Sequence, residues 1–125
     1  MIFSTSKAAE VIANLAVDER ELSVAVIRLV FTMRMLRWPD GTRIRVFVLP
    51  DAHSVHREFT KKSLELYPRQ LRRVWDRYRF SGSGPVPVEV ASEAEMAERV
   101  ATTPGAIGYL PDGAATDEVR VIHVR

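Results

Sequence analysis

The sequence contains no cysteine, which excludes disulfide bonds, cysteine nucleophiles and thiolate metal sites. It has only three histidines, too few and too scattered to indicate a zinc site, so no metal and no cofactor are predicted. Long apolar runs are missing too. The best stretch, residues 24–36, is interrupted by Arg28 and Arg34 and falls short of the ~18 residues that span a bilayer. A membrane-embedded protein is therefore not expected.

An excess of one charge is also missing, because 18 basic and 16 acidic residues leave a net charge of only +2. So small an excess creates no strong field for a polyanion, and nucleic-acid binding is not expected. The chain has 125 residues, 46% hydrophobic and 27% charged, as in globular proteins of one domain. We expect residues 1–9 to form an N-terminal tail and residues 10–125 to form the domain.

The first half of the chain predicts two strands and a helix. Residues 10–17 are mostly apolar, which is typical of a strand buried on both faces. Ser23 can cap a helix whose apolar stripe ends near Met35, and the turn at residues 38–41 follows it. Residues 18–21 are expected to form a turn. Residues 43–49 alternate Arg43, Arg45 and Phe47 with aliphatic residues, which predicts a strand with one buried face.

The second half predicts three helices and three strands. Ser54 can cap a helix to about residue 66, and Pro68 suits the first turn of the next helix. After a turn at residues 81–85 we expect a strand at 87–90. Ser92 and Glu95 form a capping box for a helix to about residue 102, followed by strands at 106–110 and 119–124. Alternating strands and helices predict an α/β fold, with four or five mostly parallel strands flanked by helices.

The helix that starts at Pro68 combines cations with aromatic residues. Arg69, Arg73 and Arg77 are spaced to form one basic stripe, whereas Trp75 and Tyr78 share an apolar face with leucine and valine. Base stacking needs accessible aromatic rings. We therefore interpret the aromatic residues as core and the arginines as the solvated side of the helix.

No catalytic arrangement is visible. The serines at 81 and 83 lie outside a G-x-S-x-G elbow, and no two carboxylates are spaced for acid–base work. We therefore do not expect an enzyme. The segment from Asp51 to Arg57 offers instead the end of a strand and the start of a helix, where open α/β sheets bind ligands. A capped turn without a ligand is the alternative interpretation.

Several phrases resemble the substrate-binding proteins of phosphate ABC transporters, which have the type 2 periplasmic binding protein fold. They are Trp-Pro-Asp-Gly at 38–41, the helix around Phe59, the segment from Trp75 to Gly84, and Val-Ala-Thr-Thr-Pro-Gly-Ala-Ile-Gly-Tyr at 100–109. The likeness covers about residues 10–124. It implies a stand-alone single lobe of that two-lobed fold.

The resemblance also implies an oxyanion site in altered form. The family's Ser-Gly-Thr positions fall on His53, Ser54 and Val55, and its arginine position falls near Leu49. The phosphate signature is therefore degraded. The tentative anion site, for a small phosphate-like oxyanion, comprises five consecutive residues: His53, Ser54, Val55, His56 and Arg57.

Two functions remain open from the sequence. The first is a non-enzymatic solute-binding module, acting alone or when a second copy completes a cleft. The second is a protein–protein interaction or sensory module that has lost solute binding. The family resemblance implies a periplasmic location. The sequence shows no complete export signal, although Ser6-Lys7-Ala8 has the small residues of a cleavage site, and a cytoplasmic location stays open.

Overall fold

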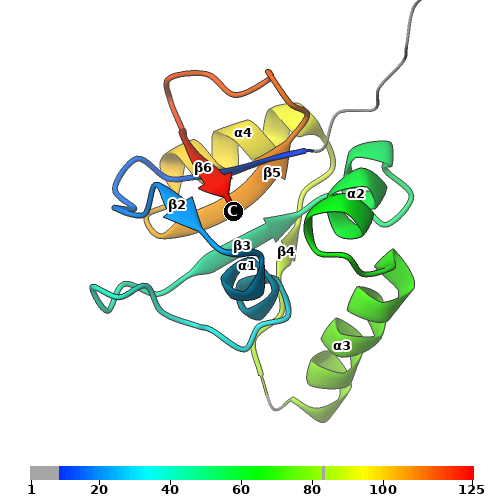
Figure 1. Cartoon of the computed structure of the whole chain (residues 1–125). Helices are drawn as coiled ribbons and strands as arrows, with labels where there is room; N and C mark the ends of the chain where they lie inside the picture. The colour runs from blue at the N-terminus through cyan, green and yellow to red at the C-terminus, as the bar shows by residue number, and fades with distance from the viewer. Residues whose placement is uncertain (1–8, 83) are drawn as a thin grey trace, which may run out of the picture.

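Six strands form one mixed sheet in the computed structural model, which describes residues 9–82 and 84–125 (Figure 1). The strand order is β2-β6-β1-β5-β3-β4. The bounds are β1 Glu10–Ala13, β2 Glu21–Leu22, β3 Arg45–Val48, β4 Val88–Glu89, β5 Ala106–Leu110 and β6 Arg120–Val124. Strand β1 is antiparallel to both of its neighbours, whereas the other three pairings are parallel. The predicted α/β fold is confirmed, with six strands among the described residues rather than four or five.

Helices cover both faces of this sheet. They are α1 Val24–Phe31, α2 Ser54–Glu58 with a π-helical continuation at Phe59–Ser63, α3 Pro68–Ser81 and α4 Glu93–Thr102. Successive residues of β5 point to opposite faces, as in any strand. Gly108 faces Met96 of α4, and Tyr109 stacks on Phe59 with ring centroids 4.0 Å apart. Helix α4 therefore packs on one face, and α1, α2 and α3 lie on the other (Figure 1).

The predicted helix starts are confirmed at α1, α3 and α4. The Ser23 hydroxyl accepts a hydrogen bond from the Val26 N–H, and Ser92 accepts one from the Glu95 N–H. The Glu95 side chain completes the cap by accepting from the Ala91 N–H at 2.8 Å. Helix α3 begins with Pro68 at its first position. These caps satisfy backbone donors that the first helical turn leaves without partners.

The apolar faces of α1 and α3 bury the side chains that their spacing predicts. Ile27, Val30 and Phe31 of α1 are buried, and α1 ends before Met35. Trp75 of α3 is buried as well, and its indole N–H donates to the Phe31 carbonyl at 2.9 Å. The arginines at 69, 73 and 77 are exposed on the opposite side of α3. The interpretation of the aromatic residues as core is confirmed for Trp75.

Four expectations about local structure were wrong. Strand β1 ends at Ala13 rather than at residue 17, and the expected turn at 18–21 contains the start of β2. Phe47 is buried, not exposed with Arg43 and Arg45, because it packs under α4, where the Arg99 guanidinium lies 5.1 Å from its ring. The helix expected at 54–66 changes from α- to π-helical at Phe59.

A tight turn joins α4 to β5 at Gly105, whose φ of +79° is in the left-handed region. The Gly105 carbonyl accepts hydrogen bonds from the Trp38 indole N–H at 3.0 Å and from the Arg45 N–H at 3.1 Å. Glycine has no Cβ and adopts this conformation without strain. The turn thus holds the 38–41 loop and the start of β3 against the start of β5.

Part of the chain lies outside the described residues. The predicted tail, residues 1–9, falls there except for Ala9, which is buried, and so does Ser83 in the predicted 81–85 turn. Among residues 9–82 and 84–125, no helix combines the length and the apolar character needed to cross a membrane.

Candidate functional site

The candidate site lies where the parallel strands β3 and β4 end. Helix α2 begins six residues after the end of β3, at Ser54, and α4 begins shortly after β4, at Glu93. Because parallel strands end at the same edge of a sheet, these two helix starts lie beside each other. The His53 Nε2 atom is 3.6 Å from the Glu93 Oε2 atom. Open α/β sheets bind ligands at this kind of edge.

His53 caps α2, in place of the predicted Ser54. The His53 Nδ1 atom accepts a hydrogen bond from the Val55 N–H at 3.1 Å. This bond occupies one of the backbone donors that an anion at the helix start would use. The other ring nitrogen of His53, Nε2, faces the Glu93 carboxylate. An anion at this position would therefore compete with a carboxylate for His53.

The other four residues of the tentative anion site point in different directions. Ser54 and Arg57 are exposed, Val55 is half-buried, and His56 is fully buried. Ser54 and Val55 line a small hollow of about 70 Å³ together with Ala9, Glu58 and Pro111. The five residues thus share one short helix, but the structure does not bring their side chains together around one cavity.

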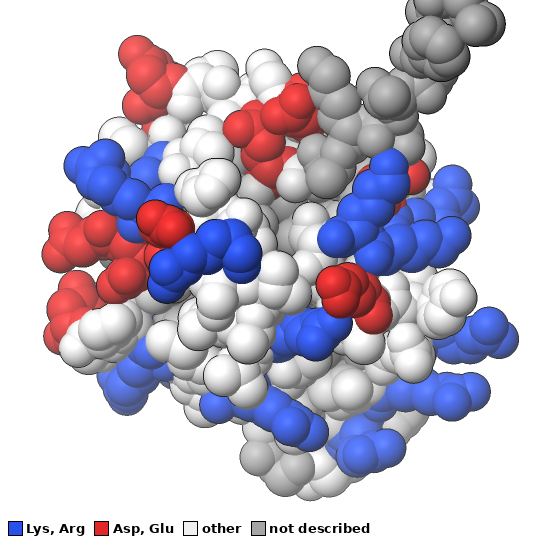
Figure 2. Space-filling model, viewed as in Figure 1, with Lys and Arg blue, Asp and Glu red and all other residues white. Residues whose placement is uncertain are grey.

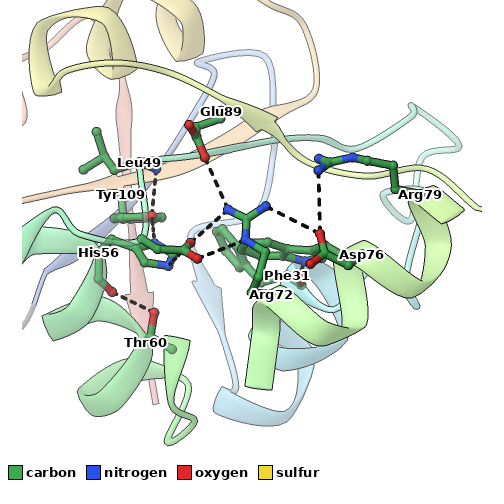
Figure 3. A network of polar contacts seen from close by, with 11 residues as sticks. Phe31, Leu49, His56, Thr60, Arg72, Asp76, Arg79, Glu89 and Tyr109 are labelled. Atoms are coloured by element: carbon green, nitrogen blue, oxygen red, sulfur yellow. Dashed lines mark hydrogen bonds and ion pairs between the residues drawn. The ribbon is translucent and has the colours of Figure 1, made fainter. Parts of the chain in front are cut away.

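His56 and Tyr109 form a polar pair in the core (Figure 3). The Leu49 N–H donates to the Tyr109 hydroxyl at 2.9 Å, so the Tyr109 O–H is free to donate to Nδ1 of His56. This geometry assigns the proton of the neutral imidazole to Nε2. That atom has no hydrogen-bond partner within the described residues and lies 3.7 Å from the Asp51 Oδ1 atom.

Burial controls the ionisation of this pair. Removal from water lowers the pKa of His56 to about 4, against a smaller opposing effect of the Asp51 carboxylate. Burial also raises the pKa of Tyr109. Groups with shifted pKa values are often catalytic, but here both rings are completely buried, so no substrate reaches them. Their arrangement is that of a structural hydrogen-bond chain.

Arg72 of α3 binds the Asp51 carboxylate shortly after the end of β3. Two parallel hydrogen bonds of 3.0 and 2.9 Å join the guanidinium to both carboxylate oxygens. Glu89, the last residue of β4, contacts the same guanidinium at 3.3 Å. These hydrogen bonds lower the pKa of Asp51, which keeps it ionised. The positive charge of Arg72 is therefore already used by acidic groups of the chain.

Sequence reasoning missed the role of Arg72. It lies off the basic stripe of α3, directly after the buried Leu71, and this position was the available signal. A cation beside the apolar face of a helix has to reach a partner at the edge of the core. The identity of that partner, Asp51, 21 positions earlier, could not be derived from spacing within one helix.

Replacing Asp51 with asparagine is expected to destabilise the fold by about 1 kcal/mol, since the bidentate pair is lost while both groups stay partly in contact with water. Glu89→Gln is the matched control. The Glu89 contact is longer and more exposed, so its loss should cost less than about 0.5 kcal/mol. Urea unfolding of both variants measures the difference. Equal effects would show that the bidentate geometry contributes nothing.

Acidic groups outnumber cations at this edge. Asp51, Asp76, Glu89 and Glu93 surround Arg72 and His53. Among residues 9–82 and 84–125, no group of three or more histidine, aspartate or glutamate side chains is arranged to hold a metal ion. An anion that binds here would be held by few donors and repelled by nearby carboxylates.

Comparison with known proteins gives matches of structure only, since no protein-family model and no curated sequence matches the chain. A protein from Clostridium perfringens assigned as a phosphate ABC transporter substrate-binding protein, solved with bound phosphate, is similar with a TM-score of 0.74 and 15% identity. An ABC-type phosphate transport receptor from Vibrio cholerae has a TM-score of 0.68 at 13% identity. PstS from Borrelia burgdorferi has a TM-score of 0.68 at 12% identity.

These matches cover 94% of this chain but only 44%, 46% and 47% of the three solved chains, in the same order. The chain thus spans less than half the length of these structures. At such low identity the likeness concerns the fold. The predicted resemblance to phosphate transporter binding proteins, with one lobe of their fold, is confirmed at that level.

Proposed function

We propose, from the premise that this chain has the fold of one lobe of phosphate-transport receptors, that it is a non-enzymatic binding module with a weak oxyanion site at the start of α2. The fold match over 94% of the chain is the observation that carries this proposal. The proposed site is at the segment predicted from the sequence, His53 to Arg57, without the buried His56. Its ligand class is a small tetrahedral oxyanion such as phosphate or sulfate.

Exposed donors support the location. The Ser54 hydroxyl faces solvent, and Arg57 is exposed without an ion pair among the described residues. The helix start adds the electrostatic preference of backbone N–H groups for anions. At the two positions where the resemblance implies an arginine and a Ser-Gly-Thr, the chain has the buried Leu49 and the segment His53 to Val55. We therefore expect a dissociation constant near millimolar rather than the tight binding of a complete site.

A non-catalytic role fits the surroundings. The buried pair His56 and Tyr109 has no access to solvent, and the accessible Asp51 is held ionised by Arg72. A general acid or base needs a pKa near the working pH and contact with its substrate. Neither the His56–Tyr109 pair nor the Asp51–Arg72 pair meets both conditions.

Phosphate or sulfate at about 10 mM is expected to raise the melting temperature. With a dissociation constant of about 1 mM, the gain is about 1.4 kcal/mol, or about 5 °C for a chain of this size. Differential scanning calorimetry with chloride at matched ionic strength measures it. Ser54→Ala and Arg57→Ala should each reduce the shift by more than half.

Arg45→Ala is the matched control, because Arg45 is an exposed arginine at the opposite end of β3 and should leave the shift unchanged. An equal shift in all variants would place oxyanion binding elsewhere. A flat response to every oxyanion would contradict the solute-binding proposal and favour its alternative, a protein–protein interaction module. Residues 10–125 are proposed as the folded unit, and the periplasmic location remains a prediction from the resemblance.

A further inference from the structure

Helix α1 has a second, outward-facing side in addition to its buried stripe. Ala25, Leu29 and Thr32 follow each other at spacings of four and three, so they lie on one side of the helix. Together with Leu66 and Val74 of the neighbouring α3 region, they line an open hollow of about 440 Å³. We call this hollow the α1–α3 groove.

The floor of the α1–α3 groove is aliphatic and accessible. Leu29 is 40% exposed, and Leu66 and Val74 are half-buried. Leu66 also borders a second hollow of about 380 Å³, which extends the groove towards the exposed Tyr67. These aliphatic side chains give a partner a small apolar contact surface between the two helices.

Cations flank this apolar floor. Arg28 and Arg34 line the groove, and Arg77 lies one helical turn after Val74. Arg28 is paired with Glu65 at 3.1 Å, whereas Arg34 and Arg77 have no ion pair among the described residues. Figure 2 shows Lys and Arg side chains gathered over the part of this face where α1 and α3 lie, with few acidic side chains between them.

We infer that the α1–α3 groove binds an acidic amphipathic helix of a partner protein. The apolar side of such a helix fits the floor formed by Leu29, Leu66 and Val74, and its carboxylates can pair with Arg34 and Arg77. Docking of an amphipathic helix into an apolar groove is a recurrent recognition mode, read through anchors at i, i+3 or i+4, and i+7. Complementary charge at the rim adds specificity and speeds association.

The shape and chemistry of the groove favour this occupant over other polyanions. A nucleic acid would stack its bases on exposed aromatic rings, whereas the floor formed by Leu29, Leu66 and Val74 is aliphatic and the exposed Tyr67 lies only in the second hollow. An anionic membrane presents a broad surface that does not fill a concave hollow between two helices. The groove shares no residue with the segment from His53 to Arg57, so this inference does not depend on the proposed oxyanion site.

Selection from a displayed library of random peptides of about 16 residues, roughly four helical turns, tests the inference without assuming a partner. Selected peptides are expected to be rich in Asp and Glu and to carry apolar residues at helical spacing. Their affinity, measured by fluorescence polarisation, should fall as salt is raised, because the rim contacts are exposed ion pairs. Failure to select any such peptide would overturn the inference.

Two variants of the full chain locate the binding. Leu29→Glu places a charge in the floor and Arg77→Glu reverses one at the rim, and each should weaken peptide binding at least tenfold. Arg20→Glu is the matched control: this exposed arginine does not line the groove, and its reversal should change affinity less than twofold. Thermal melts of all three confirm folding. Equal binding by Leu29→Glu and Arg20→Glu would overturn the inference.

The competing occupants have separate readouts. A single-stranded oligonucleotide and vesicles containing phosphatidylserine are titrated in the same assay, and the mass of the chain in solution is measured by light scattering. Neither probe should bind at the concentrations at which the peptides do, and Leu29→Glu should leave the mass unchanged. Preferential binding of either probe through Arg77, or a dimer that Leu29→Glu dissociates, would overturn the inference.

Discussion

Replacing Gly105 with alanine is expected to lower the free energy of unfolding by about 3 kcal/mol or more. A Cβ atom at this position would lie 2.2 Å from the Arg43 carbonyl oxygen, and backbone atoms cannot move aside as the end of a side chain can. The positive φ adds about 1 kcal/mol of strain to any residue with a side chain, and forced displacement of packed atoms costs about 1–3 kcal/mol. Urea unfolding measures the loss.

Gly113→Ala is the matched control for this clash. Gly113 also has a positive φ, +84°, but nothing lies within 4 Å of a Cβ built on it. This variant should therefore lose only about 1 kcal/mol from backbone strain. If both variants lost the same amount, contact with the Arg43 carbonyl would not be the cause. The Gly105 variant should also weaken the Trp38 bond to the turn, visible as a change in tryptophan fluorescence.

Stability is expected to fall by about 3 kcal/mol as the pH drops from about 6.5 to about 4. Burial lowers the pKa of His56 to about 4 from its ordinary value of 6.5, so the unfolded chain binds a proton at higher pH than the folded chain. Because its pKa is lower in the fold than in the unfolded chain, His56 contributes stability that is fully present above pH 6.5. That contribution is lost as the pH falls. Unfolding free energies at several pH values, at constant salt, measure the slope.

His56→Gln tests the origin of this slope. Glutamine offers an acceptor near the Tyr109 hydroxyl but does not ionise, so its profile should be nearly flat between pH 6.5 and 4, at a lower overall stability. His123→Gln changes an exposed imidazole on β6, and its profile should follow that of the unmodified chain. The Asp51–Arg72 pair adds a further loss as the pH falls below about 3.8, because the unfolded chain then takes up a proton at Asp51 while the lowered pKa in the fold keeps Asp51 ionised. If the stability of His56→Gln still fell between pH 6.5 and 4, the attribution of this slope to His56 would be wrong.

The helices were largely predictable because their signals are local. Ser23, Pro68 and Ser92 each lie within one turn of the backbone groups that they cap or begin, and the apolar spacing in α1 and α3 repeats within each helix. Strand β5 was predicted with its observed bounds, Ala106–Leu110. Its apolar residues are followed by Pro111 and preceded by the Gly105 turn, so both ends are marked in the sequence.

The features that were missed depend on neighbours far away in the chain. Nothing within residues 43–49 shows that α4 covers Phe47, and the two-residue strand β2, which was not predicted, exists only through its pairing with β6. The antiparallel direction of β1 is likewise a property of the assembled sheet.

In the candidate site too, the features with a local sequence signal were predicted and those that depend on distant residues were not. The segment at the end of β3 was found from the sequence, because a strand end followed by a helix start is a local pattern. The sequence did not predict that His53 accepts a hydrogen bond from the Val55 N–H, or that His56 forms a hydrogen bond with Tyr109. The second of these bonds joins residues 53 positions apart, and it turns a residue predicted to face a ligand into part of the core.

Strand β1 sets the order in which the chain can complete its sheet. Glu10 pairs with Leu110 and Val11 with Ile122, so β1 has no partner in the sheet until β5 and β6 have been made. Contacts between such distant residues form slowly, and an unpaired strand exposes backbone donors and acceptors to other chains. Until β5 and β6 have been made, the nascent chain therefore carries β1 as an open edge.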